Sequence, residues 1–351
     1  MRIVSSLLGL VLAAGTAATP IMAAAQAAAQ PIVLKYSSYH PQTIWFTSKG
    51  INPWIAEVEK ATQGRVKIET LPKTVGTPAS AFEVARDGLA DMSIVIAGYT
   101  PGRFPLAEMG ELPFAGDDAS TMSPAFDRIY RKHFAKAEEF KGVEVLSIFT
   151  ISPGHIFTTK RQVKTFDDLK GLKLRSPGAT STRSLTLMGA VPILKSFTEA
   201  HEMLSTGAID GSLMLKETVK SGNAVDLLKY GTLVPGGVFN AVLAVVVNAD
   251  KWKAIPEADR KAIMSVSGEA MARHMGLAYV EADKEAVGLM TQAKYVVETA
   301  SPALMADMKK ALAPQESEWV ERAKKKGIAD PMAVLNEFRQ ESVKPSVATA
   351  R

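Results

Sequence analysis

The stretch DLKGLKLRSPG, residues 168–178, contains the pattern from which the rest of the chain can be interpreted. It predicts the end of a short polar helix, a tight turn at Gly171 and a strand over 172–174 that stops at Arg175. A Ser-Pro-Gly break follows at once, and no acidic residue stands next to Arg175 to pair with its charge. An arginine in this position is a candidate for contact with a ligand.

The composition limits the class of protein. The 351 residues favour two domains, and the 47% of hydrophobic residues are enough for packed cores. Cysteine is absent, which excludes disulfides, thiolate nucleophiles, cysteine-based zinc sites and lipidated cysteines. The net charge of +5 is modest, and the basic residues are dispersed without interleaved aromatic residues. We therefore expect no binding to nucleic acid.

Residues 1–25 are predicted to form a secretory signal peptide. Arg2 provides a basic start, residues 3–14 are apolar, and small residues then offer cleavage sites after Ala25 or Ala29. A membrane anchor is the alternative, which is disfavoured because the apolar run is shorter than the ~20 residues that a membrane span needs. The mature protein is therefore expected to be exported and soluble.

Strands and helices alternate along the chain, which predicts an α/β protein with mostly parallel sheets. The predicted strands are 32–38, 65–71, 91–98, 143–149, 172–175, 191–195, 209–215, 241–248 and 294–299. The predicted helices between them are 45–62, 80–88, 119–140, 180–189 and 198–207, and a helical run over 256–290 forms one kinked helix or two.

The strings DGLADMSI (87–94) and TGAIDGSL (206–213) both place a glycine, two residues and an aspartate before a strand. They predict the same helix–strand joint in each half, although glycine-capped joints are also common without symmetry.

Motifs of catalysis are missing from the sequence. None of the five histidines lies in a zinc-protease arrangement, and no nucleophile elbow, phosphate-binding loop or dinucleotide fingerprint occurs. We therefore expect a binding protein rather than an enzyme, without catalytic residues, metal or cofactor. Open α/β sheets bind ligands at the carboxyl ends of their strands, which is where Arg175 lies.

The longer stretch FTTKRQVKTFDDLKGLKLRSPG (157–178) resembles the extracytoplasmic solute-binding subunits of tripartite ATP-independent periplasmic (TRAP) transporters, in their dicarboxylate-binding-protein-like family. The resemblance extends to GRVKIETLP (64–72), ARDGLADMSI (85–94), ELPF (111–114) and LMGAVPILKSFTEAHEMLSTGAIDG (187–211). It implies a two-domain periplasmic binding protein fold, with a ligand cleft between the domains and a long helix spanning both. Domain I is then expected to comprise 31–158 and 247–285, and domain II to comprise 159–246 and 286–351.

The resemblance also implies a function. The chain is expected to be a monomer in the periplasm that captures a small organic acid and delivers it to the membrane subunits of a TRAP transporter. One alternative is a ligand-sensing subunit for a membrane receptor kinase, whose binding domain would have the same sequence features. Another is an exported enzyme that uses the same cleft.

By this resemblance, Arg175 forms a salt bridge with the carboxylate of the ligand, which suits the fork of a guanidinium group. Arg161 stands where the family often has a second basic contact, and Phe197 aligns with an aromatic residue that packs on the ligand. The alternatives are a surface charge for either arginine and a core position for Phe197.

Further candidates lie at the ends of the predicted strands in the first half. Tyr39, His40 and Trp45 follow the first strand, and Tyr99 and Arg103 follow the strand over 91–98. These ends should face the cleft. The alternatives are local packing for the aromatic residues and a surface charge for Arg103.

One departure from the family concerns the ligand. The family usually continues Asp-Gly with Gln-Glu-Asn-Pro, whose asparagine helps to hold the ligand. Here Met214 takes the place of that asparagine after Asp210-Gly211. A soft apolar side chain predicts a monocarboxylate with an apolar or aromatic body. The alternative is that Met214 turns into the core.

Overall fold

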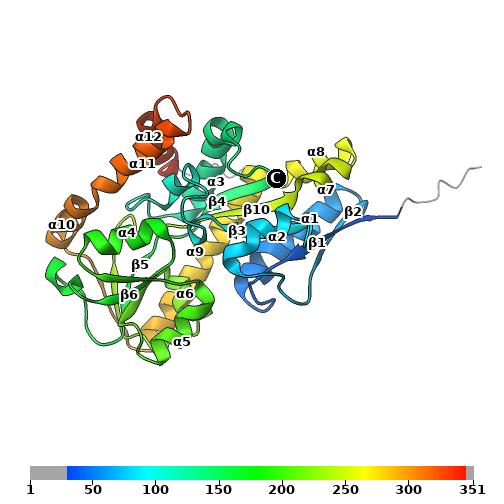
Figure 1. Cartoon of the computed structure of the whole chain (residues 1–351). Helices are drawn as coiled ribbons and strands as arrows, with labels where there is room; N and C mark the ends of the chain where they lie inside the picture. Colours follow the sequence, from blue (N-terminus) through cyan, green and yellow to red (C-terminus); the bar gives the residue numbers. More distant parts are fainter. Residues whose placement is uncertain (1–29, 345–351) are drawn as a thin grey trace, which may run out of the picture. The chain divides into compact units, whose positions relative to one another are not determined.

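The computed structural model describes residues 30–344, and the predicted signal peptide over 1–25 lies outside them. Within these residues the strands form two sheets, as expected for the predicted α/β fold (Figure 1). The first sheet has the order β2-β1-β3-β10-β4, with β1 at Ile32–Ser37, β2 at Val66–Thr70, β3 at Met92–Ile96, β4 at Val143–Thr150 and β10 at Val242–Asn248. The second has the order β11-β9-β5-β8-β6-β7, with β5 at His155–Thr158, β6 at Lys173–Ser176, β7 at Val191–Leu194, β8 at Gly211–Met214, β9 at Tyr230–Leu233 and β11 at Val296–Thr299.

Each sheet is mostly parallel, as predicted, and contains one antiparallel strand. In the first sheet β1 is parallel to β2 and β3, but β10 is antiparallel to both β3 and β4. In the second, β6 is parallel to β7 and β8, whereas β5 is antiparallel to β8 and β9. β5 is the first strand after the chain leaves the first sheet, and β10 is the first strand after it returns. The strands β5 and β9, with four residues each, were missed because short strands give little periodicity.

Helices connect the strands and cover the sheets (Figure 1). They are α1 at Asn52–Ala61, α2 at Ala81–Arg86, α3 at Ala119–Ile129, α4 at Ala179–Leu187, α5 at Ala200–Ser205, α6 at Lys216–Ser221, α7 at Ala249–Ala254, α8 at Glu257–Ser265, α9 at Gly268–Gln292, α10 at Pro302–Leu312, α11 at Pro314–Lys325 and α12 at Pro331–Ser342. The predicted helices over 45–62 and 119–140 are each made of an α-helix joined to π- or 3-10-helical turns.

The two predicted glycine–aspartate joints have the same geometry. After α2 and after α5 the chain passes through a glycine with a φ of 71° and 72°, respectively. The carboxylate of Asp91 then accepts a hydrogen bond from the backbone N–H of Lys35 in β1, at 2.8 Å. The carboxylate of Asp210 accepts one from the backbone N–H of Lys173 in β6, at 2.9 Å. Each aspartate thus fixes its strand to the parallel neighbour, so the joint recurs in both halves.

The long apolar sequence of β10 follows from its position between two hydrophobic cores. Leu243, Val245 and Val247 face a core that extends from the first sheet to the second, while the residues between them face a core beneath α3 and α12. A strand buried on both faces has no polar alternation. The expectation of a buried strand over 241–248 is confirmed.

The helical run over 256–290 is two helices, α8 and α9. The break lies at Val266 and Ser267, where Ser267 is extended, and α9 then begins at Gly268, whose φ of 53° favours glycine. α9 has 25 residues and packs against α3 and β4 at one end and α6 at the other, so it links the elements of both sheets. Gly276 permits the close approach to α3, because a Cβ atom there would lie 2.3 Å from the carbonyl oxygen of Ala119.

We propose a division into domains that differs from the predicted one. β5 pairs in the second sheet and β10 in the first. If each domain contains one sheet, the chain passes from domain I to domain II between β4 and β5 and returns between β9 and β10. α12 would join domain I rather than domain II, because the ring of Phe338 packs edge-on against Phe126 of α3, 5.5 Å between centroids. Both sheets lie in one compact unit that begins at Pro31.

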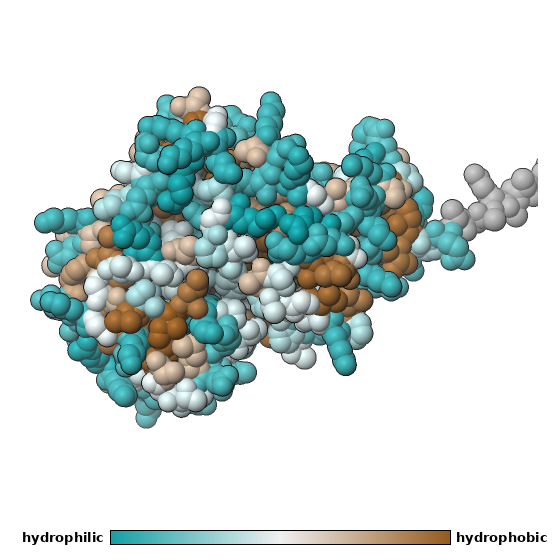
Figure 2. All heavy atoms as spheres, viewed as in Figure 1, coloured by the Kyte–Doolittle hydropathy of each residue, from teal (hydrophilic) through white to brown (hydrophobic). Residues whose placement is uncertain are grey.

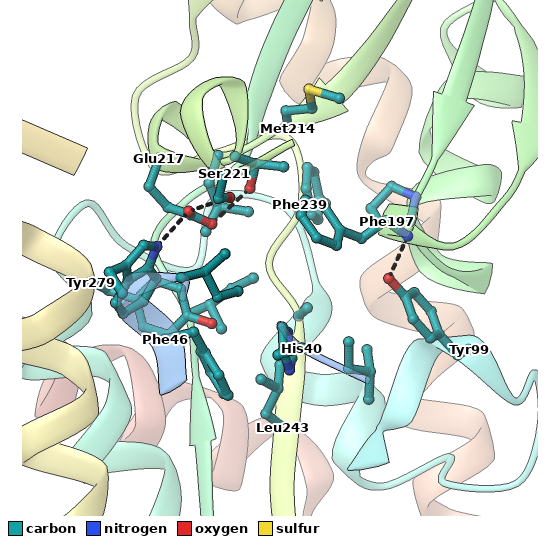
Figure 3. Close-up of a pocket in the computed structure, with 18 of the residues that line it drawn as sticks. His40, Phe46, Tyr99, Phe197, Met214, Glu217, Ser221, Phe239, Leu243 and Tyr279 are labelled. Atoms are coloured by element: carbon teal, nitrogen blue, oxygen red, sulfur yellow. Dashed lines mark hydrogen bonds between the residues drawn. The ribbon is translucent and has the colours of Figure 1, made fainter. Parts of the chain in front are cut away.

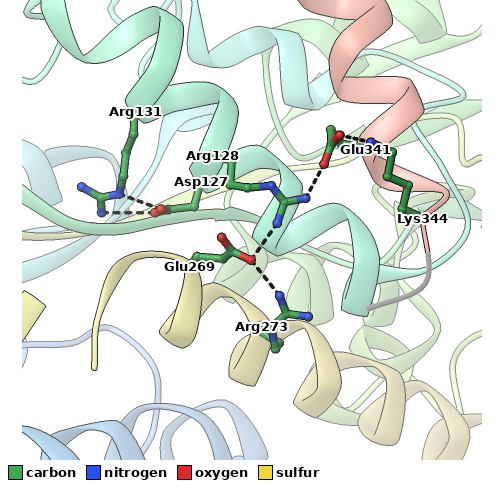
Figure 4. Close-up of polar contacts among 7 residues, drawn as sticks. All are labelled: Asp127, Arg128, Arg131, Glu269, Arg273, Glu341 and Lys344. Carbon is green, nitrogen blue, oxygen red and sulfur yellow. Dashed lines mark hydrogen bonds and ion pairs between the residues drawn. The ribbon is translucent and has the colours of Figure 1, made fainter. Parts of the chain in front are cut away.

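An ion pair ties the C-terminal helix α12 to α3 (Figure 4). Arg128 of α3 contacts Glu269 of α9 at 2.7 Å and Glu341 of α12 at 2.8 Å. Arg273 also contacts Glu269, and Lys344 contacts Glu341. Because these side chains are partly exposed, each pair contributes about 0–1 kcal/mol.

The outer surface is mainly hydrophilic on the face that Figure 2 shows, with hydrophobic residues gathered in a few patches. Among the helices of residues 30–344, none is long and apolar enough to span a membrane.

Candidate functional site

A pocket lies between the elements of the two sheets, with an empty volume of about 630 Å³ that includes the open space at its mouth. It is lined by His40, Ile44, Trp45, Phe46, Ile96, Tyr99, Ile151, Arg175, Pro177, Phe197, Met214, Leu215, Glu217, Thr218, Ser221, Phe239, Ala241, Leu243 and Tyr279. Most of these side chains are apolar or aromatic, and the charged ones are few (Figure 3).

Arg175 is a buried cation without an ionic partner among the described residues. It lies at the end of β6 and is 2% exposed. Its Nε donates to the carbonyl oxygen of Lys195 at 2.9 Å, and one Nη donates to that of Leu213 at 3.3 Å. Burial lowers the pKa of the guanidinium, an effect opposed by the Tyr99 hydroxyl and by the charge of Glu199. A buried arginine held by neutral carbonyl groups is suited to receive a carboxylate.

Tyr99 connects the two halves of the pocket beside Arg175. It ends the short turn Ala97–Tyr99 after β3, and its hydroxyl accepts a hydrogen bond from the backbone N–H of Phe197 at 2.9 Å (Figure 3). The same hydroxyl lies close enough to Arg175 to oppose the lowering of the guanidinium pKa. Tyr99 therefore connects the two sides of the pocket at this end.

Glu217, at the start of α6, was not predicted from the sequence. Its Oε2 accepts hydrogen bonds from Trp45 Nε1 and Ser221 Oγ, and its Oε1 accepts one from Thr218 Oγ1, each at 2.8 Å. Its backbone N–H donates to Asp283 of α9 at 2.8 Å. Burial raises the pKa of the Glu217 carboxyl, and the three side-chain donors oppose that rise. The only signal in the sequence was its place just after β8, near the carboxyl end of that strand.

Aromatic rings form the wall of the pocket nearest the first sheet. His40 stacks on Phe46 with centroids 4.1 Å apart, and Trp45 meets Tyr279 of α9 edge-on at 4.7 Å. Burial lowers the pKa of His40 to about 3, so its ring is neutral at physiological pH and acts as an aromatic surface.

Phe239, between β9 and β10, is a further lining residue that sequence reasoning missed. Its ring occupies the place that a side chain at Gly154 would take, since a Cβ atom there would lie 1.9 Å from the ring. No local pattern around Phe239 reveals this contact with a residue so distant in the chain.

Six of the nine residues predicted from the sequence come together in this pocket. They are Arg175, Phe197, Met214, His40, Trp45 and Tyr99. Met214 is 1% exposed, lines the pocket and also packs in the core beneath the second sheet, so the two alternatives for this residue coexist.

The other three predicted residues do not line the pocket. Tyr39 packs behind His40, with ring centroids 4.5 Å apart. Arg161 is exposed and donates to the carbonyl oxygen of Asp168 at 2.9 Å. Arg103 lies over the ring of Phe82, 4.0 Å from its centroid. Local partners hold all three side chains, so this arrangement does not support direct contact with a ligand.

Within residues 30–344, no group of three or more histidine, aspartate or glutamate side chains is arranged to hold a metal ion.

Known proteins are similar to this chain in sequence and in fold. The sequence profile of the family "Bacterial extracellular solute-binding protein, family 7" matches residues 38–323. A TRAP periplasmic solute-binding protein from Bordetella bronchiseptica, with bound (R)- and (S)-mandelate, is 36% identical and has a TM-score of 0.86 over 89% of this chain and 99% of that chain.

Two further solved structures are similar. A TRAP solute-binding protein from Rhodoferax ferrireducens in complex with copurified benzoate is 28% identical, with a TM-score of 0.82 over 89% of this chain and 97% of that one. A marine metagenome TRAP solute-binding protein in complex with 3-hydroxybenzoate is 29% identical, with a TM-score of 0.82 over 89% and 98% of the two chains.

The matched profile covers most of the chain and every strand of the two sheets except β1, and the structural likeness extends over nearly the whole described fold. The chain therefore belongs to family 7 of the bacterial extracellular solute-binding proteins and is a TRAP-type extracytoplasmic solute-binding protein.

Proposed function

We propose that this protein binds an aromatic or similarly apolar monocarboxylate, with the carboxylate on Arg175 and the apolar body in the pocket. The observation that carries the proposal is a buried guanidinium group, 2% exposed and without a carboxylate partner among the described residues, at a pocket lined mainly by apolar side chains. A bidentate pair with the ligand would supply the missing negative charge. Similar proteins with bound mandelate, benzoate and 3-hydroxybenzoate support this substrate class.

The body of the ligand would lie against Phe197, Phe239, Trp45 and Met214. These side chains offer aromatic faces and a thioether, which favour a flat apolar group over a polyhydroxylated one. Affinity in the micromolar to nanomolar range corresponds to about −8 to −12 kcal/mol.

The protein would act without chemistry on its ligand. After export through its signal peptide it would remain in the periplasm, capture the acid as a monomer and deliver it to the membrane subunits of a TRAP transporter. Two hydrogen bonds between the halves, Trp45 to Glu217 and Phe197 to Tyr99, would hold the pocket closed around the ligand. We expect no binding to nucleic acid.

The first test is to denature protein purified from its host and to identify any released small molecule by mass spectrometry. A monocarboxylic acid with an apolar or aromatic body would support the proposal. Calorimetric titration with benzoate, mandelate, succinate and D-glucuronate tests the same point directly. Binding of the sugar acid or the dicarboxylate, without binding of the aromatic acids, would contradict it.

A further inference from the structure

The pocket has a second polar end, formed by α6. Glu217, Thr218 and Ser221 all line the pocket, and their side chains are hydrogen-bonded to one another. Figure 3 shows Glu217 and Ser221 on the opposite side of the pocket from Tyr99 and Phe197. Arg175 donates to the carbonyl oxygen of Lys195, two residues before Phe197, so the buried cation lies toward the Phe197 end and the buried carboxylate of Glu217 toward the other.

The hydrogen bonds of Glu217 leave capacity for one more donor. Its Oε2 accepts from Trp45 and Ser221, but its Oε1 accepts only from Thr218. An ionised carboxylate has about four acceptor positions and no donor. Oε1 can therefore accept one further hydrogen bond, and Glu217 is among the residues that line the pocket.

The charge of Glu217 also restricts what this end accepts. Glu217 is 7% exposed, and none of its three side-chain partners carries a positive charge. A second carboxylate on the ligand would meet this negative charge without a neutralising cation, and like charges at short range in a buried site repel strongly. A neutral hydroxyl group would donate to Oε1 instead.

We propose that Glu217 selects ligands with a hydroxyl donor at the end remote from the carboxylate, such as phenolic acids, and that it rejects dicarboxylates. This inference rests on the proposed function. The ligand would then be oriented by both ends of the pocket, with its carboxylate on Arg175, its ring against the apolar wall and its hydroxyl on Glu217.

The test compares ligands of the same size that differ only in the donor. Calorimetric titrations would use benzoate and phenylacetate, their 3- and 4-hydroxy forms, the matching 3- and 4-methyl forms, and terephthalate. For at least one position, the wild type should bind the hydroxy acid about tenfold or more tightly than the methyl acid, because a hydrogen bond to a charged acceptor is among the stronger ones. Terephthalate should bind more weakly than benzoate.

The variant Glu217→Gln distinguishes a role of Glu217 in selecting the ligand from a role in holding the pocket closed. The amide oxygen of this variant can still accept from Trp45 and Ser221, so the contact between the halves is retained, while the amide nitrogen replaces Oε1. The hydroxy-to-methyl ratio should then collapse to within about threefold, while the affinity for benzoate changes less. Glu202→Gln is the matched control, because this exposed carboxylate on α5 lies outside the pocket, and it should keep the wild-type ratio.

Two results would overturn the inference while leaving the proposed function intact. One is an equal affinity of the wild type for hydroxy and methyl acids at every position. The other is an unchanged ratio in Glu217→Gln, with all ligands weakened by the same factor, which would assign Glu217 to closure alone. If none of the aromatic acids binds to the wild type, the proposed function itself is wrong, and this inference with it.

Discussion

We predict that Arg175→Met removes most of the affinity for an aromatic carboxylate and leaves the chain folded. Methionine has a similar length and no charge, so the change removes the guanidinium without opening a large cavity. Loss of one partner from a desolvated, hydrogen-bonded charge pair costs about 2–5 kcal/mol. Because each 1.4 kcal/mol is a factor of ten, Kd should rise by roughly 30-fold to several thousand-fold.

The stability of the ligand-free variant should change much less, because two effects oppose each other. The carbonyl oxygen of Lys195 loses the donor that lies 2.9 Å away, which costs about 1–3 kcal/mol if nothing replaces it. The carbonyl oxygen of Leu213 keeps a contact from Ser212 Oγ at 3.0 Å. Against this loss, the variant no longer buries a cation without a counter-charge, which is itself unfavourable.

The assay pairs calorimetric titration with thermal melting in the presence and absence of the acid that binds the wild type best. Arg183→Met is the matched control, because Arg183 is 44% exposed and its ion pair with Glu318 lies on the surface. The control should keep the wild-type Kd. Arg175→Lys should fall between the two, because an ammonium group retains the charge but not the fork. A Kd for Arg175→Met within about threefold of the wild type would refute the assignment of the carboxylate to this residue.

Four further changes have expected outcomes. Tyr99→Phe leaves the backbone N–H of Phe197 without its acceptor, so ligand affinity should fall by roughly 5- to 100-fold, and an unchanged Kd would contradict the role of this bond in closure. Arg161→Ala should leave Kd unchanged in the same titration, and a large loss would return Arg161 to the site. Burial raises the pKa of the Glu111 carboxyl from its ordinary 4.5 to about 8, so the wild type loses stability as pH rises from 4.5 to 8. The Tm of Glu111→Gln relative to the wild type should therefore increase over that interval, and a constant difference in Tm would show that Glu111 is not the group responsible. Burial lowers the pKa of His155 from 6.5 to about 3, so the wild type loses stability as pH falls from 6.5 to 3, by up to about 1.4 kcal/mol per pH unit. The stability of His155→Gln should fall less steeply over this interval, and a pH dependence that coincides with that of the wild type would contradict the assignment to His155.

Local sequence was sufficient for much of this fold. The apolar run of β10, the glycine–aspartate joints before β3 and β8, and the turn and strand that end at Arg175 all follow from interactions between neighbouring residues or from burial on both faces. Arg175 was also identifiable as a candidate binding residue, because a strand end followed by Ser-Pro-Gly placed it at an edge where α/β sheets bind ligands.

The rest of the site depends on contacts between segments that are far apart in the chain. Trp45 and Glu217 are 172 residues apart, and only their meeting gives the pocket a second polar end. Arg161 and Arg103 had the right chemistry at plausible positions, but their side chains turned to Asp168 and Phe82 instead. The direction of a loop side chain is decided by competition among all the partners within reach, and the folded chain alone sets which partners those are.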